Sequence, residues 1–313
     1  MKQKFSLYSI IAACLFAVIL IYPEACLSYA LKGLNLWFTK MIPALFPFIV
    51  LSGVIIRLNL AAPCVQFLMP FLGRIFRVGP SCVYGMVVGF LCGFPMGAHT
   101  AAQLYENKMI SQKEASFLLA FCNNIGPVYF LSFVMPLLGI TSPGLYLFGM
   151  YALPFFYGLI LRYTIYSGNI CAFGSRPVPN SQEPHLASAL DQSIESALLN
   201  IARLGGYMIV FNLLFILPTL AFGIFGTSPY KNILTQGFCC LLEITGGIST
   251  LGQKAPYFVL CALPFGGLSC IAQTYSMIRG SGLSITEYIM HKMILTAITV
   301  FFYLLAANQF FLP

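Results

Sequence analysis

Residues 92–127, CGFPMGAHTAAQLYENKMISQKEASFLLAFCNNIGP, contain two helix-breaking turns within sequence that is otherwise apolar enough to cross a bilayer. The first turn, residues 93–97 (GFPMG), combines two flexible glycines with a proline that removes a helical N–H. The second turn is residues 123–127 (NNIGP). Lipid cannot hydrogen-bond the backbone groups that such turns release, so these groups must be buried in protein or reached by water. We therefore expect both turns to line an interior cavity.

Interrupted helices of this kind form the substrate site of many secondary transporters. In those sites the N-termini of half-helices face anionic groups, and the released carbonyl groups face cations. The structural alternative is a pair of proline kinks that only pack against neighbouring helices. Two breaks so close in sequence, the second of them with adjacent asparagines, favour the transport interpretation.

The composition predicts an integral membrane protein with an all-α, polytopic fold. Hydrophobic residues make up 59% of the 313 residues and charged residues only 8%, whereas an ordinary soluble domain is about one quarter charged. The net charge of +8 comes from basic residues scattered along the chain, which gives nucleic-acid binding little support. We expect a multi-pass protein of the cell membrane with broken or re-entrant helices and the lipid bilayer as its partner.

The motifs GFPMGA, ISxxEA and LLAFCNNxGP follow one another in this order between residues 93 and 127. This pattern resembles the YlbJ family of sporulation integral membrane proteins, part of a wider group with a nucleoside-recognition gate domain. A weaker likeness returns at residues 242–245 and 263–267. The resemblance implies a fold distantly like that of concentrative nucleoside transporters. It further implies a role in spore formation, dipicolinic acid as the cargo and, in a spore former, the outer forespore membrane as the location.

We expect the chain to consist of four parts. Residues 5–23 carry no charge and follow Lys2 and Lys4, which predicts a retained transmembrane helix with a cytoplasmic N-terminus rather than a cleaved signal peptide. A stretch rich in glycine, proline and serine divides the rest of the chain nearly in half. The parts are an N-terminal transmembrane helix at 1–27, a first, gate-like repeat at 28–167, a linker at 168–187 and a second repeat at 188–313.

The region before the first break predicts unusual membrane segments. Residues 28–40 have the pattern of an amphipathic helix at the membrane interface, with Lys32 and Lys40 as anchors. The apolar segments 41–56 and 58–73 are short, and each is followed by arginine, which favours a re-entrant hairpin over two full spans. For the whole chain we expect roughly eight to ten hydrophobic elements.

Three ordered matches indicate that the two halves are pseudo-symmetric repeats. The matching pairs are 93–98 with 262–267 (GFPMGA and ALPFGG), 102–105 with 272–275 (AQxY) and the capping boxes 111–114 and 284–287. Chance similarity between short apolar motifs is the alternative explanation. In a transporter built from repeats the substrate lies near the midplane where the repeats meet. We therefore expect the GFPMG break and its counterpart in the second half to approach each other.

Glu243 is the one acidic residue that lies between uncharged flanks, in CCLLEITGG. An ionisable group there is a functional candidate by default, either for coupling to a proton or sodium ion or for a hydrogen bond to a polar substrate. The alternative is that Glu243 ends a short helix and pairs with Lys231, Lys254 or Arg203. We expect Glu243 to face the bundle interior near the asparagine turn, because a carboxylate facing hydrocarbon costs several kcal/mol.

Asn123 and Asn124 offer uncharged amide donors and acceptors, which suit a carboxylate, a ribose-like hydroxyl or the edge of a base. Hydrogen bonding between helices is their structural alternative. Gln103 and Gln273 are weaker candidates at matching repeat positions, and we expect His99 to be structural. The predicted substrate-binding residues are Gly93, Pro95, Gly97, Asn123, Asn124, Gly126, Pro127, Glu243, Thr245, Pro264, Gly266 and Gln273.

The sequence lacks G-x-S-x-G, H-E-x-x-H and Walker motifs, so we expect no enzyme activity and either gradient-driven or passive transport. Eleven cysteines without C-x-x-C spacing and three separated histidines predict no metal site and no cofactor, apart from a coupling proton or sodium ion. The expected partner is a small, flat, polar solute, preferably anionic, and a homo-oligomer is left open. The alternatives are a nucleoside transporter and a non-transporting structural membrane protein of sporulation.

Overall fold

The computed structural model describes residues 7–139, 144–168, 185–223 and 233–310. Every regular element within these residues is a helix, which confirms the all-α prediction. Residues 169–184 of the predicted linker at 168–187 lie outside the described residues, and its last two residues begin the helix α13. The longer helices are α1 (Leu7–Ile21), α2 (Pro23–Leu36), α3 (Ile42–Arg57), α6 (Pro80–Cys92), α7 (Met96–Glu106), α8 (Gln112–Cys122), α12 (Leu153–Tyr163), α13 (Leu186–Leu213), α14 (Ile216–Gly223), α15 (Ile233–Leu242), α16 (Ile244–Leu251), α17 (Pro256–Ala262), α18 (Gly267–Ile278) and α19 (Ile285–Phe310). The short ones are α4 (Ala61–Cys64), α5 (Arg74–Phe76), α9 (Pro127–Tyr129), α10 (Met135–Leu138) and α11 (Gly144–Leu147).

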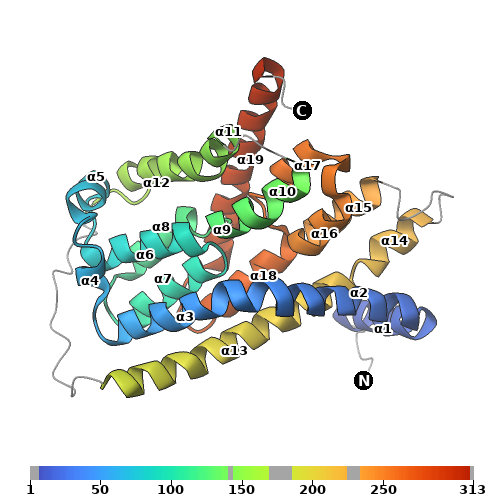
Figure 1. The fold of residues 1–313 in the computed structure, drawn as a ribbon, viewed down its shortest axis with the longest axis horizontal. Coiled ribbons are helices and arrows are strands. Elements are labelled where there is room, and N and C mark those ends of the chain that lie inside the picture. The colour runs from blue at the N-terminus through green and yellow to red at the C-terminus, as the bar shows by residue number, and fades with distance from the viewer. Residues whose placement is uncertain (1–6, 140–143, 169–184, 224–232, 311–313) are drawn as a thin grey trace, which may run out of the picture.

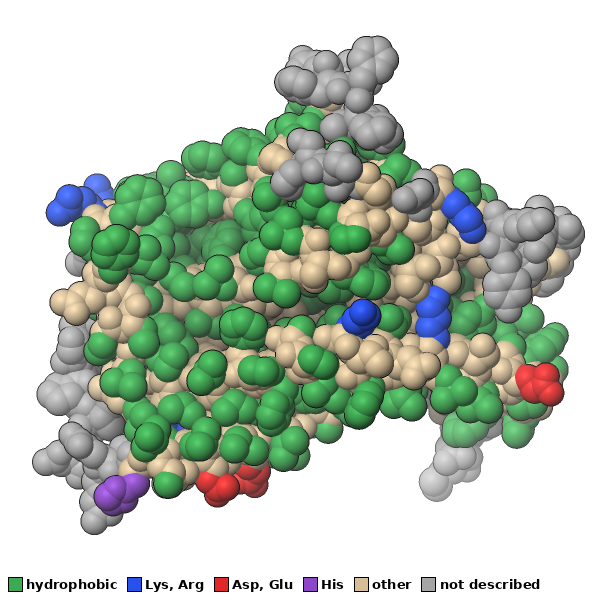
Figure 2. Space-filling view, viewed as in Figure 1, with side chains coloured by type: hydrophobic (Ala, Val, Ile, Leu, Met, Phe, Trp, Pro, Cys, Tyr) green, Lys and Arg blue, Asp and Glu red, His purple; other side chains and the backbone are tan. Residues whose placement is uncertain are grey.

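Six helical stretches of the described chain are long and apolar enough to cross a membrane. They are Pro23–Arg57, Gln112–Leu138, Gly144–Tyr163, Leu186–Gly223, Pro256–Ile278 and Ile285–Ala306. A bent pair, Met69–Phe76 and Pro80–Cys92, adds a seventh candidate, and Ser9–Ile21 and Ile233–Leu242 are shorter apolar helices. Apolar side chains also cover most of the face seen in Figure 2, with isolated charged side chains between them. The chain is therefore a multi-pass membrane protein. The number of apolar elements in its described residues falls within the predicted range of roughly eight to ten.

Proline explains three wide turns within these spans. The π turns in question are Trp37–Met41, Phe130–Val134 and Phe148–Ala152. Each precedes a helix with proline at its second position, and a proline ring clashes with the carbonyl four residues back. Those carbonyls belong to Thr39, Ser132 and Met150, which all lie inside the π turns, where the wider backbone accommodates the ring. The helices can therefore continue through their prolines.

The segment that ends at Arg57 differs from the sequence-based expectation. An interfacial helix at 28–40 and a re-entrant hairpin at 41–73 were expected, but α2 and α3 form one stretch of 35 residues. Residues 41–56 are too short to span alone, yet the π turn before Pro43 lets them continue from α2. A sharp bend lies later, where the Met69–Phe76 helix and α6 meet at 100° next to the left-handed Arg77, in a geometry that fits a broken span as well as a re-entrant loop.

Helices from both halves of the chain pack against each other. The α2–α3 stretch lies alongside α13 over much of its length, as Figure 1 shows. The helices α6, α7 and α8 pack together as the next group, and α12 joins them through α8. α7 contacts α18, and α8 contacts α19. The two helices that follow the GFPMG break therefore meet the two helices that follow the break near residue 265.

A cluster of phenylalanine rings holds α8 in place just before the asparagine turn. Phe76, Phe117 and Phe121 are fully buried, and the Phe76 and Phe121 rings stack with their centroids 5.7 Å apart. Phe155 of α12 meets the Phe76 ring edge-on at 5.1 Å. Aromatic contacts of this kind add to the stabilisation from apolar burial. The position of Asn123 is therefore defined by a rigid core two residues earlier in the chain.

The two predicted capping boxes are formed to different extents. At the start of α8, the Glu114 N–H donates to the Ser111 hydroxyl over 3.2 Å, and the Ser111 N–H donates to the Glu114 carboxylate over 2.8 Å. At the start of α19, the Glu287 N–H donates to the Ser284 hydroxyl over 3.2 Å, but the Glu287 carboxylate accepts from Tyr166 instead. The internal repeat itself stays a prediction.

Candidate functional site

The first two breaks of the chain touch each other. The backbone N–H of Phe94 donates to the carbonyl of Asn124 over 2.5 Å. Gly93 has a left-handed φ of 73°, and a Cβ atom on it would lie 2.2 Å from the amide nitrogen of Gly126. Only glycine fits this position, because an L side chain would be strained there and would overlap the backbone of the second break.

Asn123 joins three helices at the end of α8. It is 1% exposed, and its side-chain Oδ1 accepts from the backbone N–H of Ala98 in α7 over 3.2 Å. The amide Nδ2 donates to the Thr274 hydroxyl of α18 over 3.0 Å. The backbone carbonyl accepts from the Lys292 ammonium of α19 over 3.0 Å. Gly97 lies against the same residue, since a Cβ atom on it would be 3.1 Å from the Asn123 Cα.

The remaining two breaks lie against the first pair. Glu243 separates α15 from α16, and residues 263–266 separate α17 from α18. A Cβ atom on Gly267 would lie 3.2 Å from the carbonyl oxygen of Leu242, and one on Gly266 would lie 3.3 Å from the Phe94 ring. The predicted approach of the two corresponding breaks is therefore confirmed. We call the meeting point of residues 93–95, 123–126, 243 and 263–266 the break junction.

Glu243 lies inside the bundle, 2% exposed, and is the N-cap of α16. Its carboxylate accepts hydrogen bonds from the N–H groups of Thr245 (3.0 Å) and Gly246 (2.6 Å) and from the Asn212 amide of α13 (3.1 Å). The Thr245 hydroxyl is 3.3 Å from the hydroxyl of Tyr129, which follows the asparagine turn. A carboxylate at a helix N-terminus is stabilised by such donors and by the helix dipole. The predicted interior position is confirmed, with neutral groups as the donors; Lys231, one proposed partner, lies outside the described residues.

Lys292 is a buried cation that sequence reasoning missed. It is 2% exposed, and its ammonium lies 5.2 Å from the centroid of the Phe94 ring and 5.9 Å from that of the Tyr288 ring, besides its bond to Asn123. Lys292 is the only lysine, arginine, aspartate or glutamate after Glu287 in the sequence. The rule that singled out Glu243, an ionisable residue in an apolar span, would have found it as well.

The other predicted residues are placed around the junction in different ways. Pro95 follows a cis peptide bond, and Pro127 opens α9. Asn124 and Pro264 line one small cavity of about 10 Å³, which is room for about one water molecule. Gln273 is buried and donates to a serine hydroxyl one turn earlier in its own helix over 2.8 Å. The structure therefore gathers the predicted breaks at one point, with a small cavity beside Asn124 and Pro264.

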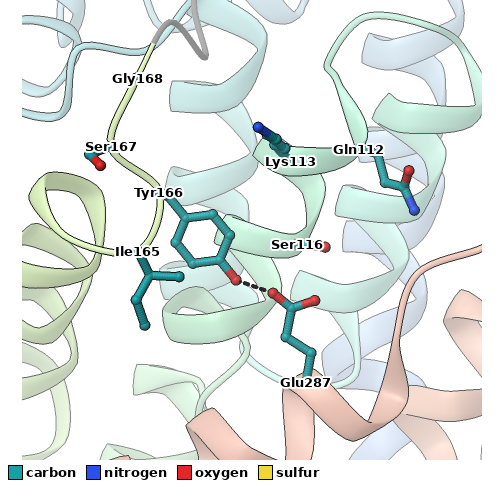
Figure 3. Close-up of a pocket in the computed structure, with 8 residues that line it drawn as sticks. All are labelled: Gln112, Lys113, Ser116, Ile165, Tyr166, Ser167, Gly168 and Glu287. Atoms are coloured by element: carbon teal, nitrogen blue, oxygen red, sulfur yellow. Dashed lines mark hydrogen bonds between the residues drawn. The ribbon is translucent and has the colours of Figure 1, made fainter.

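A separate pocket of about 310 Å³ lies at the ends of α8, α12 and α19 (Figure 3). Lys113 of α8 lines it, and the Tyr166 hydroxyl donates there to the Glu287 carboxylate of α19. The same hydroxyl lies 3.5 Å from Nε2 of His291, and His291 Nδ1 lies 2.7 Å from the hydroxyl of Tyr157. This chain of polar groups ties α12 to α19. None of the predicted site residues lines the pocket.

The arrangement at the junction suits a small anion. Lys292 supplies a positive charge, and α7 and α18 begin at the junction, so the partial positive charges of their N-termini lie there, whereas the N-terminus of α16 is already capped by the Glu243 carboxylate. Amide and hydroxyl groups of Asn123 and Thr274 add neutral hydrogen-bonding capacity. In the described part of the chain, no group of three or more His, Cys, Asp or Glu side chains could hold a metal ion.

Comparison with known proteins identifies one curated relative. The chain is 29% identical over 177 residues to the sporulation integral membrane protein YlbJ of Bacillus subtilis (strain 168). The match covers 55% of this chain and 39% of the relative, so the chain matches well under half the length of that protein. No family model and no solved structure matches the chain. Together with the six apolar stretches, the similarity supports an integral membrane protein homologous to YlbJ.

Proposed function

We propose that this chain is a gradient-driven or passive membrane transporter for a small polar organic anion, with dipicolinate as its preferred cargo. The observation that carries the proposal is the break junction, where four helix interruptions meet around the buried residues Asn123 and Lys292. Discontinuous helices of this kind hold the solute near the midplane of secondary transporters. The role in spore formation rests on the similarity to YlbJ.

Charge favours an anionic solute over a neutral one. The ammonium of Lys292 interacts with a backbone carbonyl and two aromatic rings, which only partly replace the carboxylate or phosphate that usually accompanies a buried lysine. An incoming carboxylate would supply that counter-charge. A flat dicarboxylate could also reach the N–H groups at the start of a neighbouring half-helix.

The junction must open for a solute to enter, because its cavity holds only about 10 Å³. The four breaks are natural hinge points, since each releases the backbone from helical hydrogen bonding over a few residues. Glu243, which caps α16 beside the junction, is the candidate for coupling to a proton or sodium ion. Opening would therefore change the surroundings of Glu243 and of Lys292 together.

A nucleoside is the second candidate solute. The amides of Asn123 and Asn124 suit a ribose hydroxyl or the edge of a base as well as they suit a carboxylate. A neutral nucleoside would leave Lys292 without a counter-charge, which is why we rank it second. The third possibility, a structural protein of sporulation without transport, would need the buried charges only for folding.

Uptake by the purified full chain in proteoliposomes tests the proposal. Labelled dipicolinate and labelled uridine are compared, each with and without a proton or sodium gradient. We expect dipicolinate to enter and uridine to be ignored. Uptake should fall at least about tenfold in Asn123→Ala, because a buried amide with two partners is lost. Asn35→Ala, at an exposed position, is the matched control.

Each other outcome has a defined meaning. Uridine uptake that depends on Asn123, with dipicolinate ignored, would keep the site and replace the cargo. No uptake of either solute by folded protein would support the structural role instead. Uptake that is equal in Asn123→Ala and Asn35→Ala would remove the break junction from the proposed path.

A further inference from the structure

A second region, apart from the break junction, has the features of an anion site. A cavity of about 410 Å³ lies between α3, α7, α13 and α18. It is lined by the guanidinium-bearing residues Arg57, Arg203 and Arg279, each from a different part of the chain, and by one acidic residue, Glu106. The walls therefore carry two positive charges in excess. The volume is within the range of small-molecule sites. We call this space the basic cavity.

Neutral polar side chains complete the walls of the basic cavity. His99 and Gln103 line it from α7, and Asn200 lines it from α13. The Asn200 amide Nδ2 lies 2.7 Å from Nε2 of His99. With Asn200 as the donor, the neutral His99 ring carries its hydrogen on Nδ1. His99 is 5% exposed, and this Nδ1 has no hydrogen-bond partner in the structure.

Other polar atoms in the same walls are also unsatisfied. Nε of Arg57 and Oε1 of Gln103 are buried without a partner, although a terminal nitrogen of Arg57 donates to Gln192 over 3.0 Å. Buried polar atoms without partners are rare in native proteins and call for a water, an ion or a ligand. Nε of Arg57 and Nδ1 of His99 are donors and suit an anion, whereas Oε1 of Gln103 is an acceptor. Here they coincide with an excess of positive charge around a cavity that water reaches, since Arg203, Arg279 and Glu106 are exposed, and such a charge attracts small anions.

The basic cavity lies one residue away from the break junction. Ala98 in the first turn of α7 donates its N–H to Asn123 of the junction, and the next residue, His99, stands in the cavity wall. The cavity also lies toward a basic end of the bundle, because Lys108 and Lys113 flank the turn between α7 and α8. The positive-inside rule assigns such an end to the cytoplasm.

We propose that the basic cavity binds a small organic dianion, with Arg57, Arg203 and the His99 Nδ1–H as its main donors. The dianion matches the two excess positive charges, and paired oxygens match the fork geometry of guanidinium groups. Binding at this site is a separate proposal from transport, because it is measured at equilibrium, without a gradient and without movement of the solute across the membrane. Within a transport cycle it is a loading site next to the junction.

Equilibrium binding of labelled dipicolinate to the full chain in phosphatidylcholine nanodiscs tests this proposal. We expect Kd to rise about tenfold in Arg57→Gln and about a hundredfold in the Arg57→Gln/Arg203→Gln double variant, which are usual losses for charge-assisted hydrogen bonds. Arg74→Gln removes the same charge from an exposed position outside the cavity and should change Kd less than about twofold. Picolinate, with one carboxylate, should bind more weakly than dipicolinate, and nicotinamide should not compete.

Glu106→Gln guards against misfolding as the reason for lost binding. This variant removes the one negative charge from the lining, so we expect it to bind dipicolinate several-fold more tightly. A misfolded protein would not gain affinity. Equal Kd values in the unmodified chain, Arg57→Gln and Glu106→Gln would overturn the proposal, and so would an equal loss in Arg57→Gln and Arg74→Gln.

Two further experiments distinguish binding of dipicolinate at the cavity from binding at the junction and from binding of a lipid headgroup. In a Lys292→Met background the binding at the junction should be lost, but binding at the basic cavity should remain with its dependence on Arg57, because the cavity does not include Lys292. Loss of all binding there, with Arg57→Gln unaffected, would place the solute at the junction, which overturns the loading site and leaves the transport proposal standing. Phosphatidylglycerol in the nanodisc could displace dipicolinate from the unmodified chain but have no effect on Arg57→Gln. That result would assign the cavity to a lipid headgroup and overturn the proposal that it binds a soluble dianion.

Discussion

The break junction and the basic cavity are both polar regions of a mostly apolar protein, but they differ in how their polar groups are satisfied. At the junction Asn123 has three partners and Glu243 accepts three hydrogen bonds. In the cavity, atoms of Arg57, His99 and Gln103 have no partner. Bonded buried groups help to specify one structure, whereas unsatisfied groups beside a cavity are available to a ligand. The contrast is one of degree, because Oδ1 of Asn212, whose amide donates to Glu243, also has no partner. Substitutions at the junction should therefore affect stability as well as transport, and those in the cavity should affect binding with little effect on stability.

Gly93→Ala should have the largest effect on stability. Its Cβ would lie 2.2 Å from the Gly126 nitrogen, and a φ of 73° strains any other residue. We expect the free energy of unfolding to fall by about 4 kcal/mol, measured by denaturant unfolding in detergent micelles. Gly79→Ala is the matched control, because no atom lies within 4 Å of a Cβ there. Equal stability of the two variants would contradict the contact between the first two breaks.

Lys292→Met should have the largest effect on transport. It removes the buried charge at the junction and leaves the Asn123 carbonyl without its donor. We expect the initial rate of dipicolinate uptake to fall about a hundredfold, which corresponds to about 2.7 kcal/mol. The control is Lys40→Met, at an exposed position on the π turn before α3. Uptake that survives Lys292→Met would show that the junction does not contact the solute.

Asn123→Ala tests the network at the junction directly. The change leaves the Ala98 N–H and the Thr274 hydroxyl without their partner, and we expect a loss of about 2 kcal/mol in unfolding free energy. A double-mutant cycle with Thr274→Val should give a coupling energy of about 1 kcal/mol. Additive effects of the two substitutions would mean that the Asn123–Thr274 hydrogen bond does not stabilise the fold.

Tyr166→Phe should have a smaller effect, because it removes one hydrogen bond in the pocket of Figure 3. The Tyr166 hydroxyl donates to Glu287, and its loss should lower the unfolding free energy by about 1 kcal/mol. Tyr163→Phe, whose hydroxyl donates to a backbone carbonyl at an exposed site, is the comparison and should cost less. If Tyr166→Phe were no less stable than Tyr163→Phe, the hydrogen bond from Tyr166 to Glu287 would not stabilise the contact between α12 and α19.

Arg57→Gln should have the smallest effect on stability. Its side chain donates to Gln192 at an exposed position, and a glutamine can fill part of the same space. We expect unfolding free energies to agree within about 0.5 kcal/mol while dipicolinate binding weakens. A large loss of stability would mean that Arg57 is a structural residue that holds α3 to α13. Residues of the cavity would then affect stability in the same way as residues of the junction.

Local sequence determined where the helices break. Glycine and proline at residues 93–97 and 264–267 interrupt a helix through φ preferences and a missing N–H, which are properties of the residues themselves. The composition determined the membrane location in the same way, because an apolar chain with 8% charged residues cannot form an ordinary soluble domain. The interior position of Glu243 follows from the cost of a charge in lipid, which also depends on a single residue.

Only the tertiary structure decided which residues face each other. Lys292 and Asn123 are 169 residues apart in sequence, and the basic cavity combines side chains from four helices. Periodicity and motifs describe the chain over one or two turns, so they carry no information about such pairs. The continuous helix from α2 to α3 likewise depends on the π turn that accommodates the ring of Pro43. Both α2 and α3 pack against α13, which favours the continuous helix over a break at this proline. Contacts of this range are decided by how helices pack in three dimensions, because burial and hydrogen bonding are satisfied for the whole bundle at once.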